Sequence, residues 1–390
     1  TVDEMRKDPI AMQSNYDIID KLESKRLSLN DSFKPRSANL HVIWNITKKC
    51  AMGCKICATR DEPRREATSE EKLKILYALA TEKNRIKMID FAGGDPCQSD
   101  DSVEIIKNAI LLFGQDTVSV TTTATGIQKL SAPVQRAILS QCEITIDAAH
   151  SYLSADASDS PTRGLKDYSA TNVRQLAVSS DCIKKLTINI PILNNDLNDD
   201  EIEKLAKEIE KINKQCVTTS VEAVLIRLMP VGGHGADETT KNDYMSYNPI
   251  KTARKIRAAL LQYDIPCKYH CSLRTLDCLQ SSGGGNCSLL DRKIGIDSAG
   301  NVFACAWGGY LPGYNTILDN PFYLGNLLEK DLKEILSTEN ETNAYRRIRN
   351  MNNVKPGRNY CEVVSRFIDP TDNSNRYPLA QSNEEVKSAN

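Results

Sequence analysis

The sequence lacks the features that would place the protein in a membrane or on a nucleic acid. No apolar run of about eighteen residues is present, and the first twenty residues contain no apolar signal-peptide segment. Lys and Arg number 50 against 51 Asp and Glu, so the formal net charge is -1. No overall field attracts phosphate backbones or anionic lipids. We therefore expect a cytoplasmic protein that binds neither nucleic acid nor membrane.

The composition is that of a soluble globular protein. Hydrophobic residues make up 40% of the 390 residues and charged residues 26%. This length is two or three times that of an ordinary domain, so we expect more than one structural unit.

From residue 40 onward, the apolar periodicity alternates between about 2 and about 3.6 residues, which is typical of strand–helix units in a mainly parallel sheet. Six such units are fewer than the eight or so that close a barrel. The sequence therefore predicts an α/β protein with a partial (β/α)6 TIM-like barrel, whose chemistry lies at the C-terminal ends of the strands. The predicted strands are Leu40–Thr47, Ile86–Phe91, Thr117–Thr122, Glu143–Asp147, Leu186–Ile190 and Val221–Leu228.

Helices are predicted between these strands. Thr68 and Glu71 have the spacing of a capping box, which predicts that a helix begins there. Its apolar face is predicted to consist of Leu73, Leu76, Tyr77 and Ala80. Further helices are expected after Ser102, Ser131, Tyr168 and Asp199, and from about Ile250 to Tyr263.

The breaker sequence Pro230–Gly235 marks a domain boundary. Beyond it, Lys293–Asp297 and Asn301–Ala304 flank a Ser-Ala-Gly turn and predict a hairpin. The expected organisation is an N-terminal helical extension (1–38), the partial barrel (39–232), a linker and helix (233–264), a small cysteine-rich domain (265–365) and a polar tail (366–390).

Thirteen cysteines are unusual for a protein in a reducing compartment, where thiols serve as packing groups, metal ligands or catalysts. Cys50, Cys54 and Cys57 share one loop directly after the first strand. Three thiolates from one loop suit a cubane iron–sulfur cluster with one iron left open. The alternative is a zinc site, but this needs a fourth ligand, and the nearest histidine, His41, lies within the strand.

The cysteine loop, with Ile56 before its last cysteine, resembles the cluster loop of the radical S-adenosylmethionine (radical SAM) superfamily. The segment FAGGDP, from Phe91 to Pro96, resembles the Gly-Gly-Glu-Pro turn whose backbone holds the methionine amino group of the cofactor, with Asp95 in place of the usual Glu. Glycines permit such a close backbone approach.

Weaker similarities follow at the next strand ends. TTTATG, from Thr121 to Gly126, stands where the family has Thr-Asn-Gly, and Asp147 followed by Arg163-Gly164 resembles the family's later pattern. Thr123, Asp147 and Asn189 also fit strand-end caps or Asx turns. The resemblance implies that S-adenosylmethionine is contacted by Ile56, Gly93, Gly94, Asp95, Thr123, Asp147 and Asn189.

The distal cysteines resemble an auxiliary-cluster module. Cys287, Gly300 and Cys305 match the opening of the SPASM domain or of its shorter twitch form, but only Cys361 follows them. The resemblance thus implies one auxiliary 4Fe-4S cluster on Cys287, Cys305 and Cys361. Its fourth ligand would be Cys278, with Cys271 or an open site as the alternatives.

The resemblance implies a radical SAM enzyme that cleaves S-adenosylmethionine to a 5'-deoxyadenosyl radical, which abstracts hydrogen from a substrate. The electron would come from a donor such as flavodoxin or ferredoxin. The expected substrate is a peptide or protein side chain that is crosslinked, oxidised or epimerised. The alternatives are a small polar molecule such as a carbohydrate and, in another class, a non-catalytic iron–sulfur or zinc scaffold.

No acid–base residue is identified by the sequence. The candidates Cys97, His150, Tyr152, Arg227 and His234 could face the cavity, but each fits a packing or surface role better. Four solitary cysteines are predicted to be small buried hydrophobic residues, whereas Cys267 and Cys271 fit either core thiols or substrate-facing groups. The four are Cys97, Cys142, Cys182 and Cys216.

Overall fold

The computed structural model describes the strands and helices that carry most of the predicted site. The predictions for the N-terminal extension and the C-terminal tail lie outside the described residues. The described residues are 39–52, 57, 59, 64–141, 143–147, 183, 185–192, 197–215, 221–228, 249–270, 293–310, 316–341 and 343–344.

Six neighbouring strands form a parallel sheet in chain order, which confirms the predicted partial barrel. Their C-terminal ends therefore share one edge of the sheet, where loops carry the chemistry in barrels of this kind. The strands are β1 (Leu40–Thr47), β2 (Ile86–Gly93), β3 (Val118–Thr122), β4 (Glu143–Asp147), β5 (Lys185–Ile192) and β6 (Val221–Leu228).

Four further strands extend this sheet at its two edges. β7 (Cys267–Tyr269) lies parallel to β6, and β8 (Lys293–Ile296) lies parallel to β1. β9 (Asn301–Phe303) and β10 (Tyr323–Asn326) continue antiparallel beyond β8. The predicted hairpin is confirmed as β8 and β9. Its hydrogen bonding to β1 was not predicted, because strand pairing over such a distance leaves no local sequence pattern.

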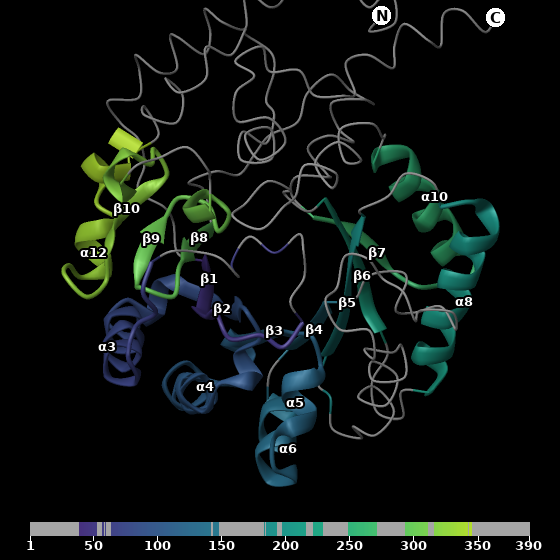
Figure 1. The fold of residues 1–390 in the computed structure, drawn as a ribbon, viewed down its shortest axis with the longest axis horizontal. Coiled ribbons are helices and arrows are strands. Elements are labelled where there is room, and N and C mark those ends of the chain that lie inside the picture. Colours follow the sequence, from purple (N-terminus) through teal and green to yellow (C-terminus); the bar gives the residue numbers. More distant parts are fainter. Residues whose placement is uncertain are drawn as a thin grey trace, which may run out of the picture.

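Helices lie along the outer side of the curved sheet (Figure 1). None of those described has the length and apolar composition that a bilayer crossing requires. The helices are α3 (Ser69–Ala80), α4 (Asp100–Phe113), α5 (Thr125–Lys129), α6 (Ala132–Gln141), α8 (Asp199–Gln215), α10 (Pro249–Leu261) and α12 (Leu332–Ile335). Short 3-10 turns are η2 (Lys83–Arg85), η3 (Pro96–Gln98), η4 (Gln115–Thr117), η7 (Gly308–Tyr310) and η8 (Ile317–Asp319).

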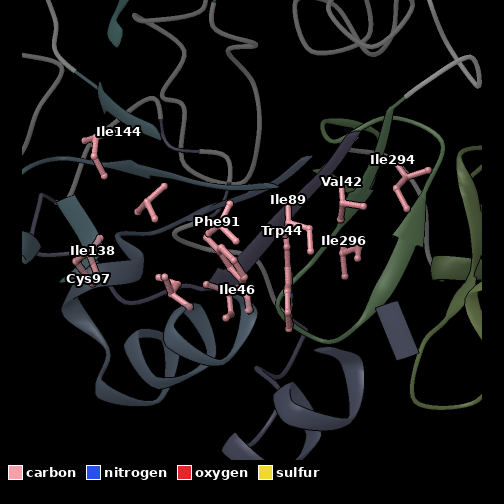
Figure 2. Packing of buried hydrophobic residues seen from close by; sticks show 14 of the residues in the cluster. Val42, Trp44, Ile46, Ile89, Phe91, Cys97, Ile138, Ile144, Ile294 and Ile296 are labelled. Carbon is pink, nitrogen blue, oxygen red and sulfur yellow. The ribbon is translucent and has the colours of Figure 1, made fainter. Parts of the chain in front are cut away.

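The hydrophobic core lies between the sheet and these helices. Alternate residues of β1 are fully buried, and Trp44 packs against Phe91 of β2 with ring centroids 5.6 Å apart. Figure 2 shows Trp44, Ile46 and Phe91 gathered on the helix-covered side. The intervening residues of each strand therefore point to the opposite face, the interior of the barrel.

Helix α3 begins as predicted, and its predicted apolar face is confirmed in part, since Leu76 is buried and Leu73 packs against the core. Thr68 and Glu71 form both hydrogen bonds of the capping box. Tyr77, however, is 53% exposed. Lys72, which no apolar pattern can reveal, shares the buried side with aliphatic residues. The buried residues are Lys72, Ile75, Leu76 and Leu79.

Lys72 joins three segments through ion pairs. Its ammonium lies 2.7 Å from a Glu66 oxygen and 2.7 Å from an Asp101 oxygen, and its side chain is 1% exposed. Burial would raise the pKa of Glu66, but the Lys48 N–H and Lys72 hold that pKa below its ordinary value. Burial would also raise the pKa of Asp101, but hydrogen bonds from Lys72 and Ser99 lower this pKa to about 2. This ionic cluster anchors α3 and α4 to the chain that follows the cysteine loop.

Replacing Lys72 by Met should destabilise the protein by about 3 kcal/mol, because two carboxylates lose a buried partner. Equilibrium denaturation of the iron-free protein measures this loss. Both carboxylates have lowered pKa values, so the stabilisation is present above about pH 4. It is lost as the pH falls towards about 2, the pKa of Asp101.

Lys74→Met is the matched control, because Lys74 forms an exposed pair with Glu70 and should contribute less than about 1 kcal/mol. Equal losses in the two variants would contradict a structural role for the buried ammonium.

Candidate functional site

The cysteine loop after β1 lies against the segments that follow β2 and β3. The Ala51 N–H donates to the Gln98 Oε1 at 2.8 Å, and the Thr125 hydroxyl lies 4.0 Å from the Met52 sulfur. Three strand ends therefore meet around this loop, as expected for parallel strands.

Two of the three predicted cluster ligands are described, and their surroundings fit such a role. Cys50 is exposed, and Cys57 is partly buried with its sulfur 3.1 Å from the Thr59 hydroxyl. Both thiols belong to one loop at the C-terminal edge of the sheet, and thiolates are the donors that iron–sulfur clusters require. The remaining loop ligand, Cys54, and the neighbouring Ile56 lie outside the described residues.

Within the described part of the chain, no set of three or more Cys, His, Asp or Glu side chains could enclose a metal ion. His41 sits near the opposite end of β1 from the cysteine loop. Burial and the nearby Lys293 lower its pKa to about 4. The described residues thus provide no fourth zinc ligand beside Cys50 and Cys57.

Gly93 and Gly94 let the end of β2 lie directly against the backbone that precedes Cys50. Gly93 has a φ of +116°, which favours glycine. A Cβ atom at Gly94 would lie 2.3 Å from the Lys49 carbonyl oxygen. The Gly94 N–H donates to the Thr47 carbonyl at 2.7 Å, and the Asp95 N–H donates to the Lys49 carbonyl at 2.7 Å. The glycines thus bring two chain segments together, whereas their predicted cofactor contact stays a prediction.

The Asp95 carboxylate ties the end of β2 to the end of β3. It is fully buried and accepts hydrogen bonds from the hydroxyls of Thr122 at 2.9 Å and Thr123 at 2.6 Å. The backbone N–H groups of Cys97, Thr123 and Gly126 also donate to it. A Cβ atom at Gly126 would lie 2.7 Å from Asp95 Oδ1. The side chain of Asp95 therefore holds the segments after β2 and β3 together. Any cofactor contact by this residue would come from its backbone.

The other predicted cofactor neighbours lie on the same edge of the sheet. Thr123 is 5% exposed and hydrogen-bonds to Asp95, as a strand-end cap would. Asp147, the last residue of β4, is in register with Asn189 on β5, and Asn189 is 1% exposed. The structure thus brings Asp147 and Asn189 side by side, while their roles as cofactor contacts stay predictions.

Of the predicted auxiliary-cluster ligands, Cys305 lies within the described residues, two positions after β9. Gly295 of β8 allows the Cys305–Ala306 backbone to cross that strand, since a Cβ atom there would lie 2.4 Å from the Ala306 Cα. Gly295 is in register with Ile43 of β1, so Cys305 lies near the strand that leads into the cysteine loop. The candidates outside the described residues are Cys271, Cys278, Cys287 and Cys361.

Two other cysteines belong to the protein core. Cys97 is 2% exposed, which confirms the prediction of a small buried hydrophobic residue. Cys267 packs against the core from β7, and burial raises its pKa to about 12, against the opposing effect of Arg257. Of the acid–base candidates, Arg227 lies on β6, while His150, Tyr152 and His234 lie outside the described residues. The other solitary cysteines, Cys142, Cys182 and Cys216, also lie outside them.

Two contributors to the site were not predicted. Gln98 holds the cysteine loop through Ala51, and Arg64 links the chain after that loop to Asp297 of the distal hairpin, with an Nε–Oδ2 distance of 3.0 Å. Neither residue belongs to a motif or has a diagnostic spacing. Their roles follow from tertiary contacts alone.

Two family models match the chain. A model for a 4Fe-4S single cluster domain matches residues 41–168, and a model for an iron-sulfur cluster-binding domain, SPASM, matches residues 287–362. The first contains the cysteine loop and the glycine turn, and the second contains Cys287, Cys305 and Cys361.

Similar proteins extend these matches. A GTP 3',8-cyclase of Lactiplantibacillus plantarum is 24% identical over 317 residues, which cover 75% of this chain and 86% of the cyclase. The crystal structure of Streptococcus suis SuiB bound to S-adenosylmethionine has a TM-score of 0.57 at 16% identity, covering 80% of this chain and 68% of SuiB. The crystal structure of SuiB bound to its precursor peptide SuiA has a TM-score of 0.56 at 15% identity, covering 83% of this chain and 69% of SuiB.

Replacing Asp95 by Asn should destabilise the protein by about 3 kcal/mol. One carboxylate oxygen becomes an NH2 group that faces buried donors, and each donor left without an acceptor costs about 1–3 kcal/mol. Denaturant unfolding of the iron-free protein checks this value. Asp90→Asn is the matched control, since Asp90 is only partly buried and accepts from two hydroxyls that can reorient. An Asp95→Asn variant as stable as the control would show that the carboxylate does not hold the two strand ends together.

Proposed function

Because the chain is a radical SAM enzyme of the SPASM type, we propose that Cys50, Cys54 and Cys57 hold the cluster at which S-adenosylmethionine is reductively cleaved. When bound, this cofactor pair supplies a 5'-deoxyadenosyl radical, which takes a hydrogen atom from the substrate and leaves as 5'-deoxyadenosine. Ile56, Gly93, Gly94, Asp95, Thr123, Asp147 and Asn189 are the proposed cofactor contacts.

One observation carries this proposal: the cysteine loop is built onto the glycine turn. Backbone hydrogen bonds of 2.7 Å from Gly94 to Thr47 and from Asp95 to Lys49 join the two segments just before Cys50. A zinc or electron-transfer scaffold needs no such turn beside its metal ligands. An enzyme that must hold an amino-acid moiety against a cluster does, because backbone groups can then bind it without interference from a Cβ atom.

The barrel interior is polar where a substrate would lie. Asp90 alternates along β2 with the buried Ile89 and Phe91, so its carboxylate is on the inner face. It accepts hydrogen bonds from the Ser119 hydroxyl at 2.8 Å and the Thr121 hydroxyl at 3.2 Å. Such a lining orients polar substrate groups, and an enclosed barrel protects a carbon radical from unwanted hydrogen donors.

We propose a peptide or protein side chain as the substrate, to be crosslinked, oxidised or epimerised. The SPASM match and the fold shared with SuiB, a protein solved with its precursor peptide, support this class. The second candidate is a small polar molecule. The similarity to a GTP 3',8-cyclase over 75% of this chain favours a nucleotide such as GTP.

The proposed organisation keeps the boundaries expected from the sequence, with the barrel at 39–232 and the auxiliary domain at 265–365. The two family models fall inside these ranges. One auxiliary 4Fe-4S cluster would use Cys287, Cys305, Cys361 and Cys278, with Cys271 or an open site as the alternative to Cys278. An electron donor such as flavodoxin or ferredoxin would act with the enzyme in the cytoplasm.

Anaerobic protein reconstituted with iron and sulfide should form 5'-deoxyadenosine from S-adenosylmethionine and dithionite. Cys57→Ala should reduce this product to background, because the cluster loses one of three ligands. Chromatographic quantification of the nucleoside measures both. Cys267→Ala is the matched thiol deletion and should retain the activity, since Cys267 packs in β7. If the intact protein contains a lone tetrahedral zinc or forms no nucleoside, the result would contradict the proposed enzyme and support a non-catalytic scaffold.

Substrate class can be tested by incubating the reduced enzyme with short peptides encoded beside its gene or with GTP. Peptide modification should appear in mass spectra as the loss of hydrogen atoms, or as deuterium incorporation in deuterated water if a stereocentre is epimerised. Each turnover should produce 5'-deoxyadenosine. Turnover of GTP with all peptides unchanged would instead support the nucleotide candidate.

A further inference from the structure

Residues 64–67 connect the cysteine loop to the distal hairpin, and we name them the bridging segment. On the side of the cysteine loop, the Lys48 N–H donates to the Glu66 carboxylate at 2.9 Å. The Lys48 ammonium donates to the Arg64 carbonyl. Lys48 lies two residues before Cys50, so the bridging segment is fixed directly to the start of that loop.

On the other side, the bridging segment contacts the turn of the β8–β9 hairpin. The Arg64 Nε lies 3.0 Å from Asp297 Oδ2, and the Ala67 N–H donates to the Ser298 carbonyl at 2.7 Å. The Asp297 side chain is 1% exposed. Burial raises the pKa of its carboxyl, and the Arg64 guanidinium opposes that rise. A buried carboxylate that needs a cation for its charged form makes this contact depend on a positive charge at position 64.

Arg64 also contacts the chain on both sides of Cys305. Its guanidinium carbon lies 5.5 Å from the centroid of the Phe303 ring, two residues before this cysteine. Its Nη2 donates to the Gly309 carbonyl at 2.7 Å, four residues after it. The Gly308 N–H donates to the Cys305 carbonyl at 2.9 Å and closes the turn between these contacts. A single planar cation thus holds both ends of the turn that carries Cys305.

We propose that Arg64 is a positioning residue that sets the place of the Cys305 turn relative to the cysteine loop of Cys50. The coupling itself follows from the described contacts, whereas its importance for two iron–sulfur clusters rests on the proposed function. Through this coupling, side chains of the proposed barrel domain help to set the distance between the two cluster sites. The fold of the proposed auxiliary domain sets the remainder.

The coupling can be measured without any metal. In iron-free full-length protein, Arg64→Gln should accelerate hydrogen exchange of backbone amides in residues 301–310 about tenfold or more, since it removes charge-assisted contacts at both ends of the turn. Arg64→Lys should fall between wild type and Arg64→Gln, because an ammonium can pair with Asp297 but cannot reproduce the planar fork. Exchange in residues 39–47 should stay unchanged.

Arg65→Gln is the matched control. The Arg65 side chain is 64% exposed and pairs with Glu71, away from the hairpin. Its exchange pattern in residues 301–310 should equal that of the wild type. Unchanged exchange there in Arg64→Gln, or an equal acceleration in 39–47 and 301–310, would overturn the proposal, since the second result indicates general destabilisation.

The reconstituted enzyme provides a second readout. Arg64→Gln should change the electron paramagnetic resonance signal of the auxiliary cluster, while the signal of the cluster at Cys50, Cys54 and Cys57 keeps its wild-type form. Loss of both signals together would contradict a positioning role. If the wild type itself makes no nucleoside, the proposed function fails, and the exchange measurements still decide whether Arg64 couples the two segments.

Discussion

The close backbone contact between the glycine turn and the start of the cysteine loop is the constraint on which the site depends. Any side chain at Gly94 would overlap the Lys49 carbonyl, so this contact exists only because the position lacks a Cβ atom. Asp95 then extends the same contact to β3 through its buried carboxylate. These hydrogen bonds hold three strand ends together at the edge of the sheet that carries the cysteine loop.

Buried charges connect this edge to the rest of the protein. Lys72 joins two helices and the bridging segment, and Arg64 joins that segment to Asp297 in the hairpin. Buried ion pairs are weak sources of stability, because desolvation offsets much of the attraction, but they are demanding in geometry. Their value here is that they specify which segments lie together. An apolar contact would allow the Cys305 turn more freedom to shift.

Local sequence patterns were reliable wherever the structure is local. The capping box at Thr68 and Glu71, the hairpin around Gly300 and the boundaries of the six parallel strands follow from hydrogen bonding and side-chain alternation over a few residues. On α3, Tyr77 was wrongly expected on the buried side. The burial of Lys72 was not predicted, because it depends on the pairing of Lys72 with Glu66 and Asp101. Such partners, 6 and 29 residues away, are invisible to periodicity.

By itself, the sequence determined the strand–helix order and the chemical types of the proposed ligands, since thiol spacing and glycine positions are properties of short segments. Only the tertiary structure decided that Asp95 faces inward to β3, that β8 pairs with β1, and that Arg64 holds the Cys305 turn. Each of these contacts joins residues remote in the chain. They form because the folded sheet buries donors and charges away from solvent. These groups must then find their hydrogen-bond or ion-pair partners on segments that are distant in the chain.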